Sequence, residues 1–151
     1  MILSAKSICL VHFALLNGVA IKLLTDPASI SNHGMVWTIG RAMRLPDAEF
    51  AKGDPAVGAI AIALLFLGIT DLTSITAFNA QFLEVAVPFR LMLAFTIAAF
   101  AYLAEDASTA IANSVVFTFA FLEVTMQFWL YVTLREERQK RVVVQVNDVD
   151  E

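Results

Sequence analysis

The sequence predicts an all-α integral membrane protein: a bundle of about four transmembrane helices, with one amphipathic interfacial helix in the first loop. Of its 151 residues, 59% are hydrophobic and only 16% are charged, whereas soluble domains are usually about 45–50% apolar and about one quarter charged. A soluble core of this size could not bury the excess apolar surface. Four stretches also approach the roughly 20 mostly apolar residues that a membrane span needs.

The first predicted span covers residues 7–24, and the polar segment that follows ends it. Asp26 is suited to cap a new helix, with Pro27 at its first position. Apolar side chains then recur at three- and four-residue spacing, which predicts one amphipathic helix over residues 27–43.

Three side chains near this amphipathic segment suit the headgroup region of a membrane. Trp37 has an amphipathic ring, and Arg41 and Arg44 are cations on the same stretch. Rings and cations of this kind concentrate at membrane interfaces. We therefore predict that all three are interfacial.

The other three spans follow at short intervals. The second covers residues 56–78 and carries no charge before Asp71. The third is predicted over residues 85–103, with Pro88 in or just before its first turn and Glu105-Asp106 at its end. The fourth is predicted over residues 108–134, is rich in aromatic residues and ends in a charged flank. These spans place one transmembrane domain in residues 1–141.

Residues 142–151 form the rest of the chain, a short acidic C-terminal tail in which we expect little regular structure. Four spans place both termini on the same side of the membrane. Basic residues favour the cytosolic side, and the terminal segments carry Lys6, Arg135, Arg138, Lys140 and Arg141. The first loop carries Arg41, Arg44 and Lys52 against this. The balance favours cytosolic termini.

Ionisable side chains at membrane depth are candidates for function. From the helical rise, Asp71, Arg90 and Glu123 lie roughly 10, 7 and 16 Å inside the half of the bilayer that faces the termini. An Asp71–Arg90 pair across a helical hairpin is geometrically reasonable, and His12 and Gln127 fall in the same half. This intramembrane polar cluster could fix helix register, bind a partner helix or lipid headgroup, form a proton or ion pathway, or support catalysis.

The sequence gives little support for an enzyme. It lacks the HExxH, GxSxG, P-loop and GxGxxG motifs. His12 and His33 are expected on opposite sides of the bilayer, so they should not bind one metal, and Cys9 is the single cysteine. We expect no catalytic residue, metal or cofactor. Without a broad basic patch, a nucleic-acid partner is also not expected.

Four segments together resemble a known family. They are Leu24-Thr25-Asp26-Pro27 with Gly40-Arg41-Ala42-Met43 and Pro46; Gly68-Ile69-Thr70-Asp71-Leu72; Pro88-Phe89-Arg90; and Phe117-Thr118-Phe119-Ala120-Phe121-Leu122-Glu123 with Phe128-Trp129 and Thr133-Leu134-Arg135-Glu136-Glu137-Arg138. In these the chain resembles the fungal "increased loss of mitochondrial DNA" membrane proteins. The resemblance implies a multi-span protein of the endoplasmic reticulum membrane with a link to mitochondrial DNA maintenance, and it implies no enzyme activity.

Two functional hypotheses follow. The first is a non-enzymatic accessory or assembly factor, chaperone-like, that contacts membrane lipids and a membrane-protein partner in the endoplasmic reticulum. The alternative is a small oligomeric channel or a lipid- or ion-handling membrane protein. Both would use the intramembrane polar cluster.

Overall fold

The computed structural model describes residues 4–77, 80–104 and 111–149. Six helices lie in these ranges, with no strand among them: α1 (Ala5–Thr25), α2 (Ala28–Ser31), α3 (Gly34–Met43), α4 (Pro55–Thr76), α5 (Ala80–Leu103) and α6 (Ser114–Val149). Helices α1, α4, α5 and α6 are each long and apolar enough to cross a membrane. The predicted fold class is therefore confirmed.

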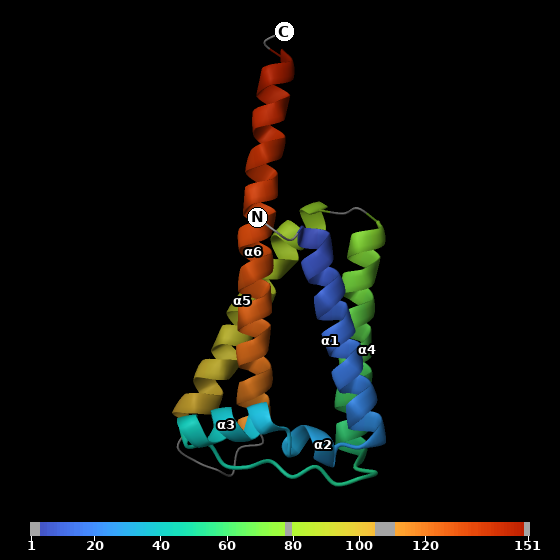
Figure 1. Cartoon of the computed structure of the whole chain (residues 1–151), viewed down its shortest axis with the longest axis vertical. Coiled ribbons are helices and arrows are strands. Elements are labelled where there is room, and N and C mark those ends of the chain that lie inside the picture. The colour runs from blue at the N-terminus through green and yellow to red at the C-terminus, as the bar shows by residue number, and fades with distance from the viewer. Residues whose placement is uncertain (1–3, 78–79, 105–110, 150–151) are drawn as a thin grey trace.

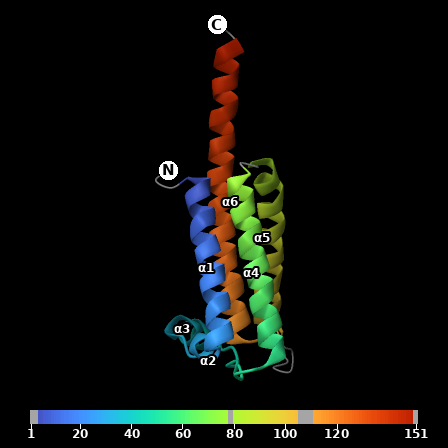
Figure 2. The ribbon, with the colours of Figure 1, turned by 90° about the vertical axis from the view of Figure 1, so that its right-hand side faces the viewer.

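The four long helices form two pairs. Helix α1 packs chiefly against α4, and α5 chiefly against α6, while α4 and α5 have few contacts with each other. The short helices α2 and α3 lie across one end of the bundle, and Figures 1 and 2 show the N-terminus and the projecting end of α6 at the other. We call these the loop end and the termini end.

Two apolar clusters hold the bundle together. The first lies toward the termini end and joins α1, α5 and α6; its buried members are Ala5, Ile8, Cys9, Leu83, Val87, Leu130 and Leu134. The second lies toward the loop end and joins α1 to α4; its buried members are Leu16, Ala20, Leu23, Val57, Ala61 and Leu64. Along α1, the segment between the two clusters contains His12, so the polar side chains lie between two apolar layers.

Close approach of α1 and α4 depends on Gly68 of α4. A Cβ added at Gly68 would collide with the side chain of Asn17. The Asn17 amide nitrogen donates instead to the carbonyl oxygen of Phe13 at 2.7 Å. Asn17 thereby satisfies one amide donor within its own helix while its side chain lies next to Gly68 of α4.

The first loop differs from the prediction of a single helix over residues 27–43. The structure has two helices there, because His33 has an extended backbone (φ −65°, ψ 133°) and its ring accepts a hydrogen bond from the N–H of Met35. The prediction for Asp26 was also wrong. Pro27 is the N-cap of α2 without a side-chain capping bond, and Asp26 is the C-cap of α1.

Helix α3 is held against the start of α6. A Cβ added at Gly40 would lie 2.7 Å from the Cβ of Ser114, so the two backbones approach closely there. The Ser114 N–H donates to the carbonyl oxygen of Pro46 at 3.0 Å, which ties the loop to the same point. Arg44 ends α3 in the left-handed conformation, with φ 56°.

Two predicted helix boundaries change. Helix α5 begins at Ala80 rather than residue 85, and Pro88 lies inside it. Because proline has no N–H, the carbonyl oxygen of Glu84 loses its usual helical partner.

Helix α6 begins at Ser114 rather than residue 108, with the Asn113 side chain accepting from the N–H of Val116. Residues 105–110, where the third span was predicted to end, lie outside the described residues.

The C-terminal tail is the largest departure. Helix α6 continues through Val149, so the expectation of little regular structure from residue 142 is wrong. The physical reason is local: the 36 residues of α6 contain neither glycine nor proline to stop the helix. At about 1.5 Å per residue, α6 is roughly 54 Å long, well beyond the hydrocarbon thickness of a bilayer of about 30 Å. Figure 1 shows its red end beyond the other helices.

Candidate functional site

All four long helices contribute to one polar cluster inside the bundle. His12 comes from α1, Asp71 from α4, Arg90 from α5, and Glu123 with Gln127 from α6. These are the five residues that the sequence predicted for the intramembrane polar cluster, and the structure brings them together. We use that name for this set.

His12 lies at the centre of the intramembrane polar cluster. Its Nδ1 is 2.7 Å from Oδ2 of Asp71, and its Nε2 is 2.8 Å from Oε1 of Glu123. Its ring therefore bridges α4 and α6, which belong to different helix pairs. His12 and Asp71 are both buried, at 4% and 3% exposure.

The two contacts of His12 constrain its protons. An ionised carboxylate oxygen can only accept a hydrogen bond, while a neutral imidazole has one donor nitrogen and one acceptor nitrogen. Two ionised carboxylates therefore require the imidazolium form of His12, with a proton on each nitrogen. In that form the cluster holds two positive and two negative charges, and this balance reduces the cost of placing them at membrane depth.

Arg90 completes the charge balance from α5. Its Nη1 donates to Oδ1 of Asp71, so the two oxygens of Asp71 serve Arg90 and His12 separately. The pair that sequence reasoning considered reasonable is present. It links α4 to α5, two helices that otherwise have few contacts.

Gln127 lies one turn beyond Glu123 on α6. Its Nε2 donates to Oε2 of Glu123 at 3.3 Å, so both oxygens of Glu123 are engaged. The amide oxygen of Gln127, Oε1, has no hydrogen-bond partner among the described residues, although Gln127 is only 1% exposed. One acceptor at the edge of the cluster is thus unpaired.

A cavity of about 190 Å³ lies between the two helix pairs beside the intramembrane polar cluster. His12, Arg90 and Glu123 form its polar wall, and the remaining wall is apolar: Leu16, Leu67, Leu93, Ala94, Ile97, Phe119 and Ala120. The side chains of Arg90 and Glu123 are 24% and 17% exposed, so part of each remains accessible. We call this space the central cavity.

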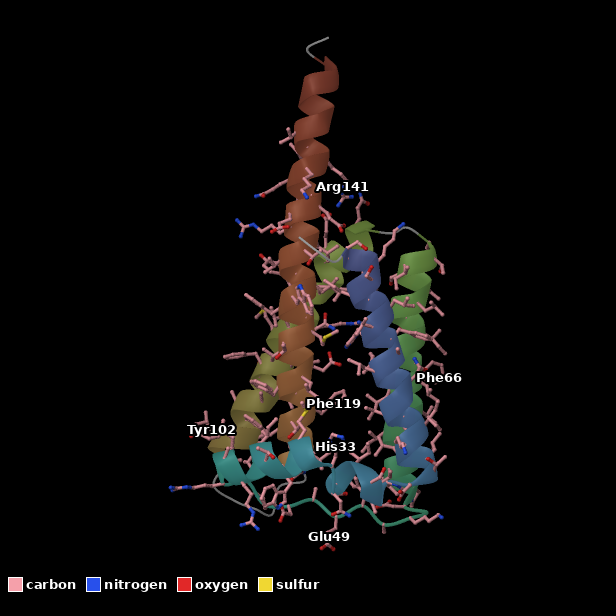
Figure 3. All side chains as sticks on the ribbon, in the orientation of Figure 1. His33, Glu49, Phe66, Tyr102, Phe119 and Arg141 are labelled. Carbon is pink, nitrogen blue, oxygen red and sulfur yellow. The ribbon has the colours of Figure 1, made fainter. Side chains whose placement is uncertain are left out.

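The predicted interfacial residues lie elsewhere. Trp37 and Arg41 are on α3, and the Arg41 guanidinium lies 5.5 Å from the centre of the Trp37 ring, a cation–π distance. Trp37 is 56% exposed, and Arg44 is the exposed C-cap of α3. Figure 3 shows His33, just before α3, at the loop end. None of the three contributes to the intramembrane polar cluster.

A second group of charged contacts, at the termini end, was not predicted. Oε1 of Glu137 accepts from the backbone N–H of Ala5 at 2.9 Å. Nη2 of Arg141 lies 2.7 Å from Oε1 of Glu84. The sequence predicted only a charged flank at the end of the fourth span, and Glu84 lay outside the predicted spans. One sequence feature could have indicated these contacts: the apolar part of α6 continues without a break into a charged segment, so the helix extends past the other spans.

Metal binding receives no support from the geometry. Within the described residues, no group of three or more His, Cys, Asp and Glu side chains is arranged to hold a metal ion. The short contacts of His12 are to carboxylates, which occupy both of its ring nitrogens. The arrangement is suited to ionic and hydrogen-bonded recognition between helices.

Comparison with known proteins gives one consistent result. A family model described as "Increased loss of mitochondrial DNA protein 1" matches residues 3–143. The Protein ilm1 of Schizosaccharomyces pombe is 28% identical over 141 residues, covering 93% of this chain and 86% of that protein. The Protein ILM1 of Saccharomyces cerevisiae is 28% identical over 138 residues, covering 91% of this chain and 68% of that protein. No solved structure matches.

The family match includes every member of the intramembrane polar cluster, from His12 to Gln127, and all four helices that supply them. It ends at residue 143, within the projecting part of α6. Since the matched region covers nearly the whole chain, the protein belongs to the increased loss of mitochondrial DNA protein 1 family.

Proposed function

We propose that this chain is a non-enzymatic accessory or assembly factor of the endoplasmic reticulum membrane, which receives a transmembrane helix of a partner protein at the central cavity. The observation that carries the proposal is the central cavity itself. It lies between two helix pairs that are joined by ionic contacts, and it combines an apolar wall with the accessible parts of Arg90 and Glu123.

The size of the central cavity favours a side chain of a docking helix over a stored small molecule. Its volume is about 190 Å³, whereas small-molecule pockets usually measure about 300–1,000 Å³. A helix placed against α4 and α5 could insert an apolar side chain among Leu67, Leu93 and Ile97. A polar group on that helix would then reach Glu123 or Arg90, where hydrogen bonds in a dry setting give specificity.

The proposal also accounts for the two-pair architecture. Helices α4 and α5 touch each other little, so a partner could separate them further without breaking a large apolar interface.

The family name records loss of mitochondrial DNA; we propose that this effect arises indirectly, through a membrane-protein client. We further propose cytosolic termini, because α6 carries four basic residues between 135 and 141, at the termini end of the bundle.

Site-specific photocrosslinking in fungal cells tests the proposal. The photoreactive residue is placed at Leu67, Leu93 or Ile97 in the central cavity, or at Phe66 or Phe95 as controls. The control side chains are 67% and 65% exposed and do not line the cavity, and Figure 3 shows Phe66 on the outer side of α4. A discrete adduct with one membrane protein, from cavity positions alone, is expected. That protein should also become less abundant when this chain is deleted.

The alternative is a small channel or a lipid- or ion-handling oligomer that uses the intramembrane polar cluster as a pathway. It predicts flux through liposomes containing the purified chain, and loss of this flux in Asp71→Asn and Glu123→Gln. Flux of that kind, together with adducts of only lipid or self, would replace the assembly-factor proposal. The contacts that join His12, Asp71, Arg90 and Glu123 are our reason for preferring the first function.

A further inference from the structure

A second and larger cavity lies at the termini end, away from the intramembrane polar cluster. Its volume is about 410 Å³, within the usual range for a bound small molecule. Its apolar floor is formed by Ile75 of α4, Leu83 of α5 and Leu134 of α6. Leu83 and Leu134 belong to the buried apolar cluster at this end. The cavity therefore opens directly above a stable core. We call it the termini cavity.

The charged side chains that line the termini cavity are mostly cations. They are Lys6, Lys140 and Arg141, with Glu137 as the one acid among the described lining residues. Glu137 is engaged by the backbone N–H of Ala5. The lining residues thus carry three positive charges and one negative charge, and the side chains of Lys6 and Lys140 are exposed. This arrangement attracts an anion.

The position of the termini cavity at the ends of the apolar spans indicates which kind of anion it would bind. Ala5 is the first residue of α1, Ile75 precedes the last residue of α4, and Leu83 lies in the first turn of α5. The floor therefore lies where the apolar spans end, and the cations lie just beyond. A phospholipid has the same order, with an anionic headgroup outside and acyl chains inside. A soluble anion would meet the cations but gain nothing from the apolar floor.

We propose that the termini cavity binds an anionic phospholipid, with its phosphate near Lys6 and Lys140 and the upper part of an acyl chain on Ile75, Leu83 and Leu134. This site is separate from the central cavity and does not depend on the proposed function. Arg141 is paired with Glu84, and Lys6 and Lys140 are the other cations that line the cavity. The site would fix the projecting part of α6 relative to the membrane surface.

Native mass spectrometry of the full chain with added phosphatidylserine tests this inference. The variant carries Lys6→Gln and Lys140→Gln. Its matched control carries Lys22→Gln and Lys52→Gln, which remove two exposed lysines from the loop end of the molecule. A lysine near an anionic lipid surface is worth about fivefold in affinity, so the variant should bind about 25-fold more weakly while the control keeps its affinity. Replacing both lysines by arginine should preserve binding.

Three results would overturn the inference. Equal losses in the variant and the loop-end control would indicate unspecific attraction. Equal binding of phosphatidylcholine would remove the role of net charge. Displacement of phosphatidylserine by inorganic phosphate or by the deacylated headgroup would indicate a site for a soluble anion. An unchanged melting temperature of the double glutamine variant is expected, because both lysines are exposed; a variant that melts early is replaced by the two single substitutions.

Discussion

The ring of His12 holds two carboxylates on opposite sides, Asp71 at 2.7 Å and Glu123 at 2.8 Å. The first belongs to the helix packed against α1, and the second to the other helix pair. His12 therefore joins the two halves of the bundle at membrane depth, as the Arg90–Asp71 pair also does. The apolar clusters lie above and below this point, and the cluster toward the termini end also joins α1 to α5 and α6. Ionic contacts and apolar packing together therefore fix the relative position of the two halves.

Removal of Asp71 should have the largest effect on stability. In Asp71→Ala, the His12 ring and the Arg90 guanidinium lose their shared partner in a buried setting. Breaking a buried ion pair on one side costs about 3–5 kcal/mol. Thermal unfolding in mild detergent measures the change, and Asp47→Ala is the control, because Asp47 is an exposed acid of the loop. Similar melting temperatures for both variants would contradict a structural role of Asp71.

A paired substitution separates charge balance from the loss of a single group. In Asp71→Asn with Arg90→Gln, one charge of each sign is removed, and two amides can still form a hydrogen bond. The double variant should be more stable than Asp71→Asn alone, because no cation is left unpaired. The four melting temperatures of the cycle give the coupling. Additive effects of the two substitutions would show that the Arg90–Asp71 contact contributes little.

The contact of α3 with α6 predicts a strong effect of side-chain size at Gly40. In Gly40→Val, the new side chain meets Ser114, and overpacking of this kind typically costs about 1–3 kcal/mol. Gly34→Val is the matched control on the same helix, because nothing lies within 4 Å of a Cβ there. Ser114→Gly should restore part of the stability lost in Gly40→Val. Equal melting temperatures for the two valine variants would contradict the close approach.

The link between Glu137 and the backbone of Ala5 predicts a local effect at the start of α1. In Glu137→Ala the N–H of Ala5 loses its acceptor, so amide hydrogen exchange in residues 5–8 should accelerate. Loss of a capping interaction of this kind costs about 0.5–2 kcal/mol. The adjacent Glu136→Ala is the control, since Glu136 does not contact Ala5. Unchanged exchange in Glu137→Ala would mean that Ser4, which caps the same turn, is sufficient alone.

The depth of each polar residue in the membrane was predictable from the sequence, but the side of the helix on which its side chain faces a neighbour was not. A fixed rise per residue placed Asp71, Arg90 and Glu123 in the same half of the bilayer, and that reasoning needs only approximate span ends. It could not show that His12 faces α4 and α6 at once. The facing of a helix in a bundle depends on contacts such as Gly68 against Asn17, which involve residues far apart in the sequence.

Besides the helical C-terminal tail, two parts of the fold were not predicted from the sequence, for different physical reasons. The break between α2 and α3 depends on the extended backbone of His33. This break does not alter the spacing of the apolar residues in 27–43, so the spacing could not predict it. The start of α5 at Ala80 depends on tolerance of Pro88 within the helix. A helical segment on both sides of a proline is stable only when surrounding packing compensates the missing bond, and packing is a tertiary property.

The central cavity gives the final prediction, which separates binding from stability. Ala120 is buried and lines the cavity, so Ala120→Leu should fill part of it. Cavity filling commonly stabilises a protein by about 0.5–2 kcal/mol, and the melting temperature should stay the same or rise. Crosslinking from Ile97 to the proposed partner helix should nevertheless fall, because the added side chain would occupy the space that we propose for that helix. Ala63→Leu adds the same group to the exposed side of α4 and should leave crosslinking unchanged; equal crosslinking in both variants would show that the partner does not enter the central cavity.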